Sequence, residues 1–144
     1  MSESISLPTT YAAGIMQSKA YRALSNFMNG YLELYNLTLS EWKVLGSLYE
    51  KGGLTPSDIG EILGVKLPIA TRLIGNMETK KLLQRSAGHQ DKRTVEVKIS
   101  AGGKKLAKQL EHNLRTEMKQ FLGDISPSEL RTYLLVLNKL AAKL

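Results

Sequence analysis

The sequence predicts a mainly α-helical fold of about six helices with one small β-hairpin, an α+β class in which helices dominate. Three observations lead to this prediction. Apolar residues recur every three or four positions over most of the chain. Two short helical patterns are separated by a tight turn at Gly64, and a stretch with a period of two follows them. A chain of 144 residues suits one compact domain.

The first two helices are predicted from apolar spacing and from a start signal. Over residues 11–35 the apolar side chains follow the i, i+3, i+4, i+7 rhythm of a long amphipathic helix. Thr38, followed by Glu41 three residues later, is a capping-box pattern. A short second helix therefore begins there and ends at the glycine pair that starts with Gly52.

The next two helices form a helix-turn-helix. Thr55 is placed as N-cap, Pro56 at the first helical position and Asp58 at the third, and Gly64 ends this helix. After a turn of about three residues the apolar pattern resumes over about residues 66–80. In such a pair the second helix is the one that enters the major groove of DNA.

A β-hairpin is predicted next. Val95, Val97 and Ile99 alternate with polar residues, and residues 82–85 can pair with them antiparallel. The connecting residues, 86–93, are polar and basic. A hairpin with a basic tip directly after a helix-turn-helix makes the arrangement a winged helix-turn-helix.

Two helices close the chain. Ser100 is expected to cap the first of them, although Gly102 and Gly103 weaken its first turn. Ser126, with Glu129 three residues later, opens the last helix by a capping box.

We expect one domain, with a DNA-binding lobe over about residues 38–99 and dimerisation helices over about 8–36 and 100–144. The terminal helices leave apolar faces that either close a monomer core or bind a second copy, and long helices with leftover apolar faces usually need a partner. A homodimer is therefore favoured. The apolar residues concerned are Tyr11, Ile15, Leu134, Leu137 and Leu140.

Charge points to a polyanionic partner. The chain carries 20 Lys and Arg against 13 Asp and Glu, a formal net charge of +7. Residues 66–98 hold eight cations and three anions, a net +5, so most of the excess lies on the predicted helix and hairpin. Double-stranded DNA is the partner that this distribution favours.

Composition and the absence of certain sequence motifs argue against a metal-binding protein, a membrane protein and an enzyme. The chain has no Cys, so it has neither disulfides nor thiolate metal sites, and we propose no metal and no cofactor. Residues 1–10 lack a signal-peptide pattern and no stretch approaches the ~18 apolar residues of a membrane span, which favours a cytoplasmic protein without membrane contact. No P-loop, GxGxxG or GxSxG motif is present, so no enzyme is expected.

The candidate DNA contacts lie on the recognition helix and the hairpin. Burial of Ala70, Leu73 and Met77 leaves one side of the helix facing outward, where arginine and asparagine can hydrogen-bond to base edges. The hairpin would lie against phosphates or in the minor groove, with Asp91 orienting a neighbouring cation. The predicted contacts are Lys66, Pro68, Ile69, Thr71, Arg72 and Asn76 on the helix, and Arg85, His89, Lys92 and Arg93 on the hairpin.

These residues resemble the multiple antibiotic resistance regulator (MarR) family over nearly the whole chain. The motifs that carry the resemblance are Gln84-Arg85, Gln90-Asp91-Lys92-Arg93, Leu63-Gly64-Val65, Thr71-Arg72-Leu73, and Leu37-Thr38-Leu39 with Trp42 and Leu45. The resemblance implies a triangular homodimer on a pseudo-palindromic operator, often released by a small aromatic ligand. It also implies that Asp91 pairs with Arg93, so that the arginine reaches the minor groove.

The chain departs from the family pattern at three positions. Lys92 replaces the first arginine of the usual Asp-Arg-Arg, which keeps the charge but gives up a bidentate contact. Lys81 stands where a helix-ending glycine is common. Gly75 lies inside the recognition helix, where a glycine costs ~1 kcal/mol relative to alanine.

Two questions of function stay open at this point. The aromatic stripe of Phe27, Tyr31, Tyr35 and Trp42 either packs in the core, the favoured interpretation, or lines the effector pocket that the family resemblance implies. The protein is predicted to be a sequence-specific transcriptional regulator, a repressor by the family's commoner habit. The competing hypothesis is an architectural protein that coats DNA without sequence preference.

Overall fold

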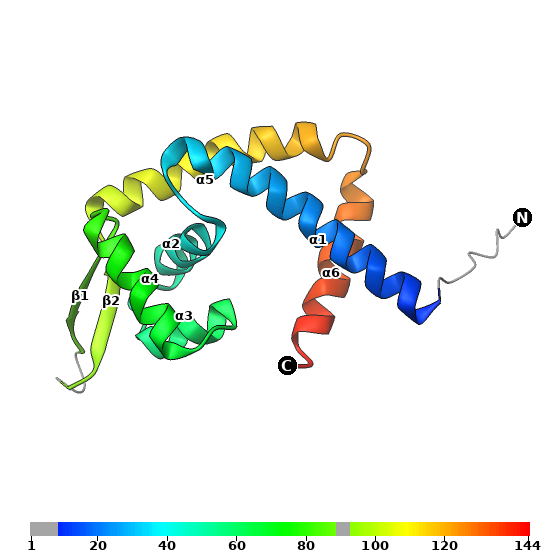
Figure 1. Cartoon of the computed structure of the whole chain (residues 1–144). Coiled ribbons are helices and arrows are strands. Elements are labelled where there is room, and N and C mark those ends of the chain that lie inside the picture. Colours follow the sequence, from blue (N-terminus) through cyan, green and yellow to red (C-terminus); the bar gives the residue numbers. More distant parts are fainter. Residues whose placement is uncertain (1–8, 89–92) are drawn as a thin grey trace, which may run out of the picture. The chain divides into compact units, whose positions relative to one another are not determined.

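The structure is a computed structural model that describes residues 9–88 and 93–144. Within these ranges it contains six α-helices and one antiparallel hairpin (Figure 1), which confirms the predicted fold class. In chain order the elements are α1 Thr10–Leu32, the 3₁₀ turn η1 Glu33–Tyr35, α2 Leu39–Lys51, α3 Pro56–Leu63, α4 Leu67–Thr79, β1 Leu83–Ala87, β2 Val95–Ile99, α5 Ala101–Phe121 and α6 Pro127–Ala141.

The chain divides into two compact units, Met1–Lys104 and Lys105–Leu144, and α5 begins in the first and continues into the second. The single domain with two dimerisation regions stays a prediction. No helix among residues 9–88 and 93–144 has both the length and the apolar character needed to cross a membrane.

Side-chain caps begin three of the helices as predicted. Thr38, Thr55 and Ser126 each accept a hydrogen bond from the backbone N–H three residues later, at 3.1 Å in all three cases. In α3 and α6 the carboxylate at the third helical position, Asp58 or Glu129, accepts a hydrogen bond from the backbone N–H of the N-cap residue. This second bond completes a capping box. In α2 the predicted box is only half formed, because the carboxylate of Glu41 binds Lys80 instead.

The first helix ends three residues earlier than predicted. Asn36 has a left-handed backbone (φ +56°), and its N–H donates to the carbonyl of Glu33 at 3.0 Å. The N–H of Leu37 donates to the carbonyl of Leu32 at 3.1 Å. Asparagine tolerates this conformation better than most residues, so the chain turns here into α2.

The hairpin is shifted from its predicted position. Leu83 pairs with Ile99 and Ala87 with Val95, so β1 covers residues 83–87 and the predicted 82–85 was wrong at both ends. Leu82 is kept out of the strand because its N–H donates to the carbonyl of Met77 at 3.1 Å, which belongs to the end of α4.

A one-residue bridge adds a third chain segment to the hairpin, and the sequence did not indicate it. The N–H of Leu54 donates to the carbonyl of Val97 at 3.0 Å, and the N–H of Val97 donates back to the carbonyl of Leu54 at 2.7 Å. The bridge attaches the hairpin to the residues just before α3.

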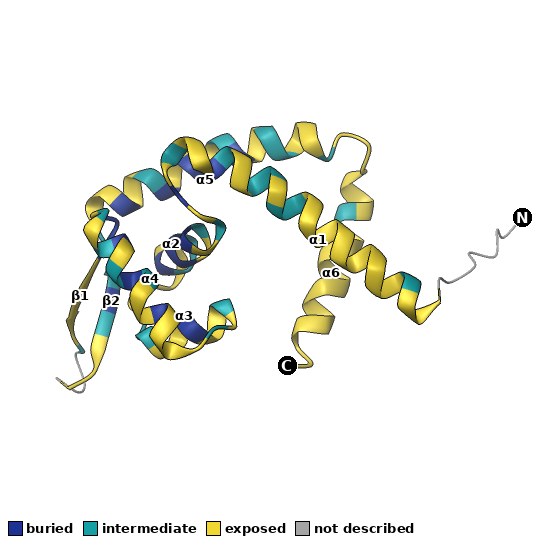
Figure 2. Cartoon of the chain, viewed as in Figure 1, coloured by how far each residue is buried: buried dark blue, intermediate teal, exposed yellow. Residues whose placement is uncertain are grey.

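The core of the first unit is made by α2, α3, α4 and β2, with the end of α1, as the dark blue segments of Figure 2 show. On α4 the buried residues are Ala70, Ile74 and Met77, whereas the predicted Leu73 is only half-buried. Steps of four and three from Ala70 place Ile74 and Met77 on one line of the helix. The buried apolar residues of this unit are Leu32, Leu37, Val44, Leu45, Leu48, Ile59, Ala70, Ile74, Met77, Leu82, Leu83 and Val97.

The second unit is different, because α6 has no buried residue. Ala107, Leu110 and Leu114 of α5 are buried. Large apolar side chains of α6 are exposed, among them Leu134 and Leu135 at 55% each, and Figure 2 shows this helix almost wholly in the colour of exposed residues.

The exit from α4 is a tight corner. Lys81 takes the left-handed conformation (φ +61°) that glycine adopts more easily, and its carbonyl accepts a hydrogen bond from Ser100 Oγ at 2.7 Å. The same Oγ accepts from the N–H of Gly103 at 3.0 Å, which confirms Ser100 as the cap of α5. Gly103 is buried, and a Cβ there would run into the carbonyl oxygen of Leu82.

We expect Gly103→Ala to lower the free energy of unfolding by about 1–3 kcal/mol, because backbone must move to admit the methyl group. Gly75→Ala is the matched control: a Cβ at Gly75 meets nothing within 4 Å, so alanine should raise stability by up to about 1 kcal/mol. Urea unfolding of both variants measures the two effects. Equal stability of Gly103→Ala and the wild type would contradict the close approach.

Candidate nucleic-acid interface

One side of α4 is exposed along its whole length. Lys66, Pro68, Ile69, Thr71, Arg72 and Asn76, the six predicted contacts on this helix, are all exposed. The core side of the same helix buries Ala70, Ile74 and Met77. The sequence thus correctly separated these six from the packed side of the helix, while their contact with DNA stays a prediction.

The start of α4 suits an anion. Lys66 is the N-cap, and among the described residues no side chain caps the first turn. Pro68 has no N–H, and the N–H of Ile69 donates to the carbonyl of Lys66 at 3.0 Å, so it is chiefly the positive end of the helix dipole and the Lys66 ammonium that attract phosphate. The first turn of α3, in contrast, is closed by its capping box.

The hairpin continues past its strands, because the N–H of Gly88 donates to the carbonyl of Thr94 at 2.8 Å. Arg93, next to Thr94, is exposed. His89, Asp91 and Lys92 lie outside the described residues, so the predicted pairing of Asp91 with Arg93 is not tested.

Arg85, another predicted contact, is bound to the recognition helix. Its Nη2 lies 2.8 Å from Oε1 of Glu78, and Glu78 Oε2 accepts from the Arg85 backbone N–H at 3.3 Å. The side-chain hydrogen bond lowers the pKa of the Glu78 carboxyl and raises the pKa of the Arg85 guanidinium. The pair joins the last turn of α4 to β1, and both side chains remain 40% exposed.

Some of the basic side chains are therefore bound within the protein and are not available to DNA. Of the eight cations counted between residues 66 and 98, Lys80 is paired with Glu41 and Arg85 with Glu78. Neither pair could be predicted from the sequence, because the partners come together only when α4 packs against α2 and β1.

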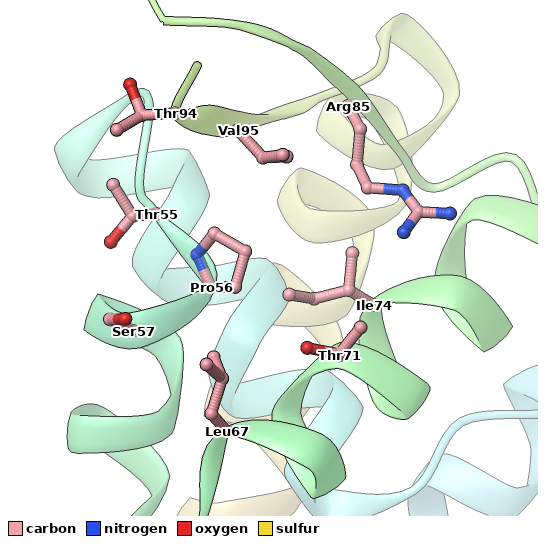
Figure 3. Close-up of a pocket in the computed structure, with 9 residues that line it drawn as sticks. All are labelled: Thr55, Pro56, Ser57, Leu67, Thr71, Ile74, Arg85, Thr94 and Val95. Carbon is pink, nitrogen blue, oxygen red and sulfur yellow. The ribbon is translucent and has the colours of Figure 1, made fainter. Parts of the chain in front are cut away.

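A shallow hollow of about 370 Å³ opens between the starts of α3 and α4 and the hairpin (Figure 3). Figure 3 shows the Arg85 side chain on the hairpin side of the hollow, with Ile74 and Thr71 of α4 below it. Most of the lining is apolar, which gives a flat ring a surface to pack on and a guanidinium beside it. The lining residues are Thr55, Pro56, Ser57, Leu67, Thr71, Ile74, Arg85, Thr94 and Val95.

The predicted aromatic pocket residues lie at the end of α1, in η1 and in α2. Phe27, Tyr31, Tyr35 and Trp42 are all half-buried. The rings of Tyr31 and Tyr35 are 5.7 Å apart at an angle of 37°, a tilted contact typical of packed aromatics. Their role in binding a ligand stays a prediction.

Two short helices joined by a tight turn, with a hairpin packed against the second, define a winged helix-turn-helix protein of the DNA-binding class. The family model described as the MarR family matches residues 37–95, which include α2, α3, α4, β1 and the start of β2. Residues 37–95 of this chain therefore carry the domain of the MarR family, a family of transcriptional regulators.

Known proteins are similar to this chain beyond these residues, and the two solved structures among them share its fold. The transcriptional regulator MhqR of Bacillus subtilis is 28% identical over 115 residues, which are 80% of this chain and 79% of MhqR. The structure of a mutant Escherichia coli MarR in complex with operator DNA has a TM-score of 0.79 at 24% identity, covering 88% of this chain and 91% of that one. BpsR of Bordetella bronchiseptica, whose DNA binding is regulated by 6-hydroxynicotinic acid, has a TM-score of 0.80 at 20% identity, covering 94% and 98%.

Proposed function

We propose that this protein represses transcription by binding a pseudo-palindromic operator as a homodimer, with α4 in the major groove and the hairpin at the flanking minor groove. The observation that carries the proposal is that α4 and the hairpin line the same hollow. Thr71 stands one residue before Arg72, and Thr94 one residue after Arg93. A helix and a wing arranged together are what groove binding requires.

The likeness to the E. coli MarR complexed with operator DNA supports the same arrangement. A protein that reads promoter DNA works where the chromosome is, so the predicted cytoplasmic location belongs to this proposal. The proposal includes no enzymatic activity.

The basic excess supports DNA as the partner in a second way. The net charge of +7 would draw the protein to any duplex, whereas Arg72 and Asn76 supply hydrogen bonds that depend on the base pair. This difference separates a regulator from the architectural alternative, which would show a similar affinity for every sequence. We favour the regulator because α4 exposes base-reading side chains as well as cations.

Dimerisation through the terminal helices is supported by their exposed apolar side chains. Tyr11 and Ile15 of α1 are 74% and 52% exposed. On α6 the exposed apolar side chains are Tyr133, Leu134, Leu135, Val136, Leu137 and Leu140. A monomer rarely leaves so many large apolar groups in water on one short helix.

A small aromatic acid is the effector class that we propose. Two places compete for it: the aromatic group of Phe27, Tyr31, Tyr35 and Trp42, and the hollow beside Arg85. The hollow has an apolar floor, and a carboxylate bound there would share the Arg85 guanidinium with Glu78. A ligand bound there would cover part of the proposed DNA surface, so it would compete with DNA directly.

For DNA binding we expect two distinct effects. Arg93→Ala should weaken binding to all duplexes and reduce the slope of log K against log salt by about 1. Arg72→Ala should change sequence preference, by on the order of 1–3 kcal/mol at one base pair. Fluorescence anisotropy on the duplex best enriched by the wild type from a randomised library, and on random duplex, measures both. Wild-type protein that enriches no sequence would favour the architectural alternative, and unchanged affinities in both variants would remove these residues from the interface.

For assembly we expect the wild type to be a dimer in light scattering at micromolar concentration. The double variant Leu134→Glu, Leu137→Glu should shift it toward the monomer, because four buried charges per dimer would oppose association. Ile62→Glu on α3, also exposed, is the control and should leave the dimer intact. A wild-type monomer would refute the dimer.

For the effector we expect 6-hydroxynicotinate to release the enriched duplex in the anisotropy assay, and cyclohexanecarboxylate to release less. Trp42 is the single tryptophan of the chain and lies in the aromatic group. Release with a change in Trp42 fluorescence would place the ligand at the aromatic group, and release without a change would favour the hollow. No release by 6-hydroxynicotinate or by benzoate would count against an aromatic acid effector.

A further inference from the structure

The C-terminal end of the recognition helix is held by an ion pair whose carboxylate is buried. Lys80 is the residue that follows α4, and its Nζ lies 2.8 Å from Oε2 and 3.2 Å from Oε1 of Glu41. The same Nζ donates to the backbone carbonyl of Asn36 at 2.6 Å. All three residues belong to the first compact unit, but Lys80 lies 44 positions from Asn36 and 39 from Glu41 in the sequence.

Glu41 is unusual in its burial. It is 4% exposed and is the only charged residue buried among residues 9–88 and 93–144. Its Oε1 also accepts a hydrogen bond from Thr38 Oγ1 at 3.2 Å. A buried carboxylate needs a partner in good geometry to offset its lost hydration, so Lys80 cannot move away without a large penalty.

The contacts of Lys80 join three parts of the lobe. Glu41 lies in the first turn of α2, Asn36 forms the left-handed corner between η1 and α2, and Lys80 ends α4. The neighbouring Lys81 is fixed by Ser100, as described above. The last turn of the recognition helix is therefore tied on one side to α2 and on the other to the start of α5.

We infer that Lys80 is a positioning residue, which sets the orientation of the recognition helix against α2 through Glu41 and Asn36 and does not itself contact DNA. This inference rests on the proposed function. Lys80 lies within the basic stretch of residues 66–98, and charge alone would assign it to phosphate. The geometry assigns its charge to the buried carboxylate, so its effect on DNA is indirect.

Three interpretations of Lys80 give different results. A phosphate contact would contribute to counterion release, and its loss would lower the salt slope for every duplex. A purely structural pair would change unfolding and leave the affinity of the folded protein intact. A positioning pair affects the enriched sequence more than random DNA, because only base contacts need α4 at one angle.

The experiment uses the full chain and the duplex that the wild type enriches from a randomised library. The variants are Lys80→Gln, Glu41→Gln and the conservative Lys80→Arg, whose guanidinium can still bind the carboxylate. Lys66→Gln removes an exposed lysine at the start of α4 and serves as the phosphate-contact control. Lys51→Gln, at the end of α2, is the neutral control. Thermal unfolding shows that each variant is folded at the assay temperature.

We expect Lys80→Gln and Glu41→Gln to lower affinity for the enriched duplex on the order of tenfold, with random-duplex affinity and salt slope unchanged. Lys80→Arg should restore the wild-type affinity. Lys66→Gln should lower the salt slope by about 1 on both duplexes. Should the Gln variants not fold, the double variant Lys80→Met, Glu41→Leu replaces the pair by apolar groups and should fold while showing the same selective loss.

Two results would overturn the inference. A salt slope that falls by about 1 in Lys80→Gln would make Lys80 a phosphate contact. Unchanged affinity of folded Lys80→Gln and Glu41→Gln for the enriched duplex would leave the pair a purely structural one. If the library yields no enriched sequence with the wild type, it is the proposed function that fails, and this outcome is recognised before any variant is tested.

Discussion

The left-handed turn at Lys81 is the constraint on which the arrangement of α4, the hairpin and the first residues of α5 depends. It ends the helix, sends the chain through Leu82 into β1, and leaves a carbonyl that Ser100 binds from the other end of the hairpin. The approach of Gly103 to Leu82 then brings the start of α5 against the same corner. Because a non-glycine residue in this conformation is strained, the surrounding hydrogen bonds must hold it there.

Local signals in the sequence predicted most of the helices. The caps at Thr55, Ser100 and Ser126 were correct, because a cap depends only on neighbours within one turn. The spacing of apolar residues correctly predicted which side of α4 is exposed, except that Leu73, predicted to be buried, is only half-buried. The end of α1 was placed too late, since the period continues through a 3₁₀ turn and gives no sign of the corner at Asn36.

Contacts between distant residues could not be predicted from the sequence. Leu54 bonds to Val97 through backbone atoms alone, so no side-chain pattern marks it. The pairing of Glu41 with Lys80 and of Glu78 with Arg85 depends on how the helices pack, and a count of charges cannot divide cations into those that bind protein and those that remain available. The hollow is likewise lined by four separate chain segments, which come together only in the folded lobe.

The exposed residues and the buried residues of α4 lie on opposite sides of the helix, and this arrangement affects how the DNA-binding preference of such a protein can change in evolution. Its outward residues lie among solvent, where an exchange usually changes stability within about ±0.5 kcal/mol, whereas its inward residues and the corner at Gly103 are fixed by packing. Exchanges at positions such as Ile69 and Asn76 therefore alter the proposed DNA-binding surface without disturbing the packing of the core. New binding preferences become accessible through single steps that leave the scaffold intact, and selection can act on them without first finding compensating mutations.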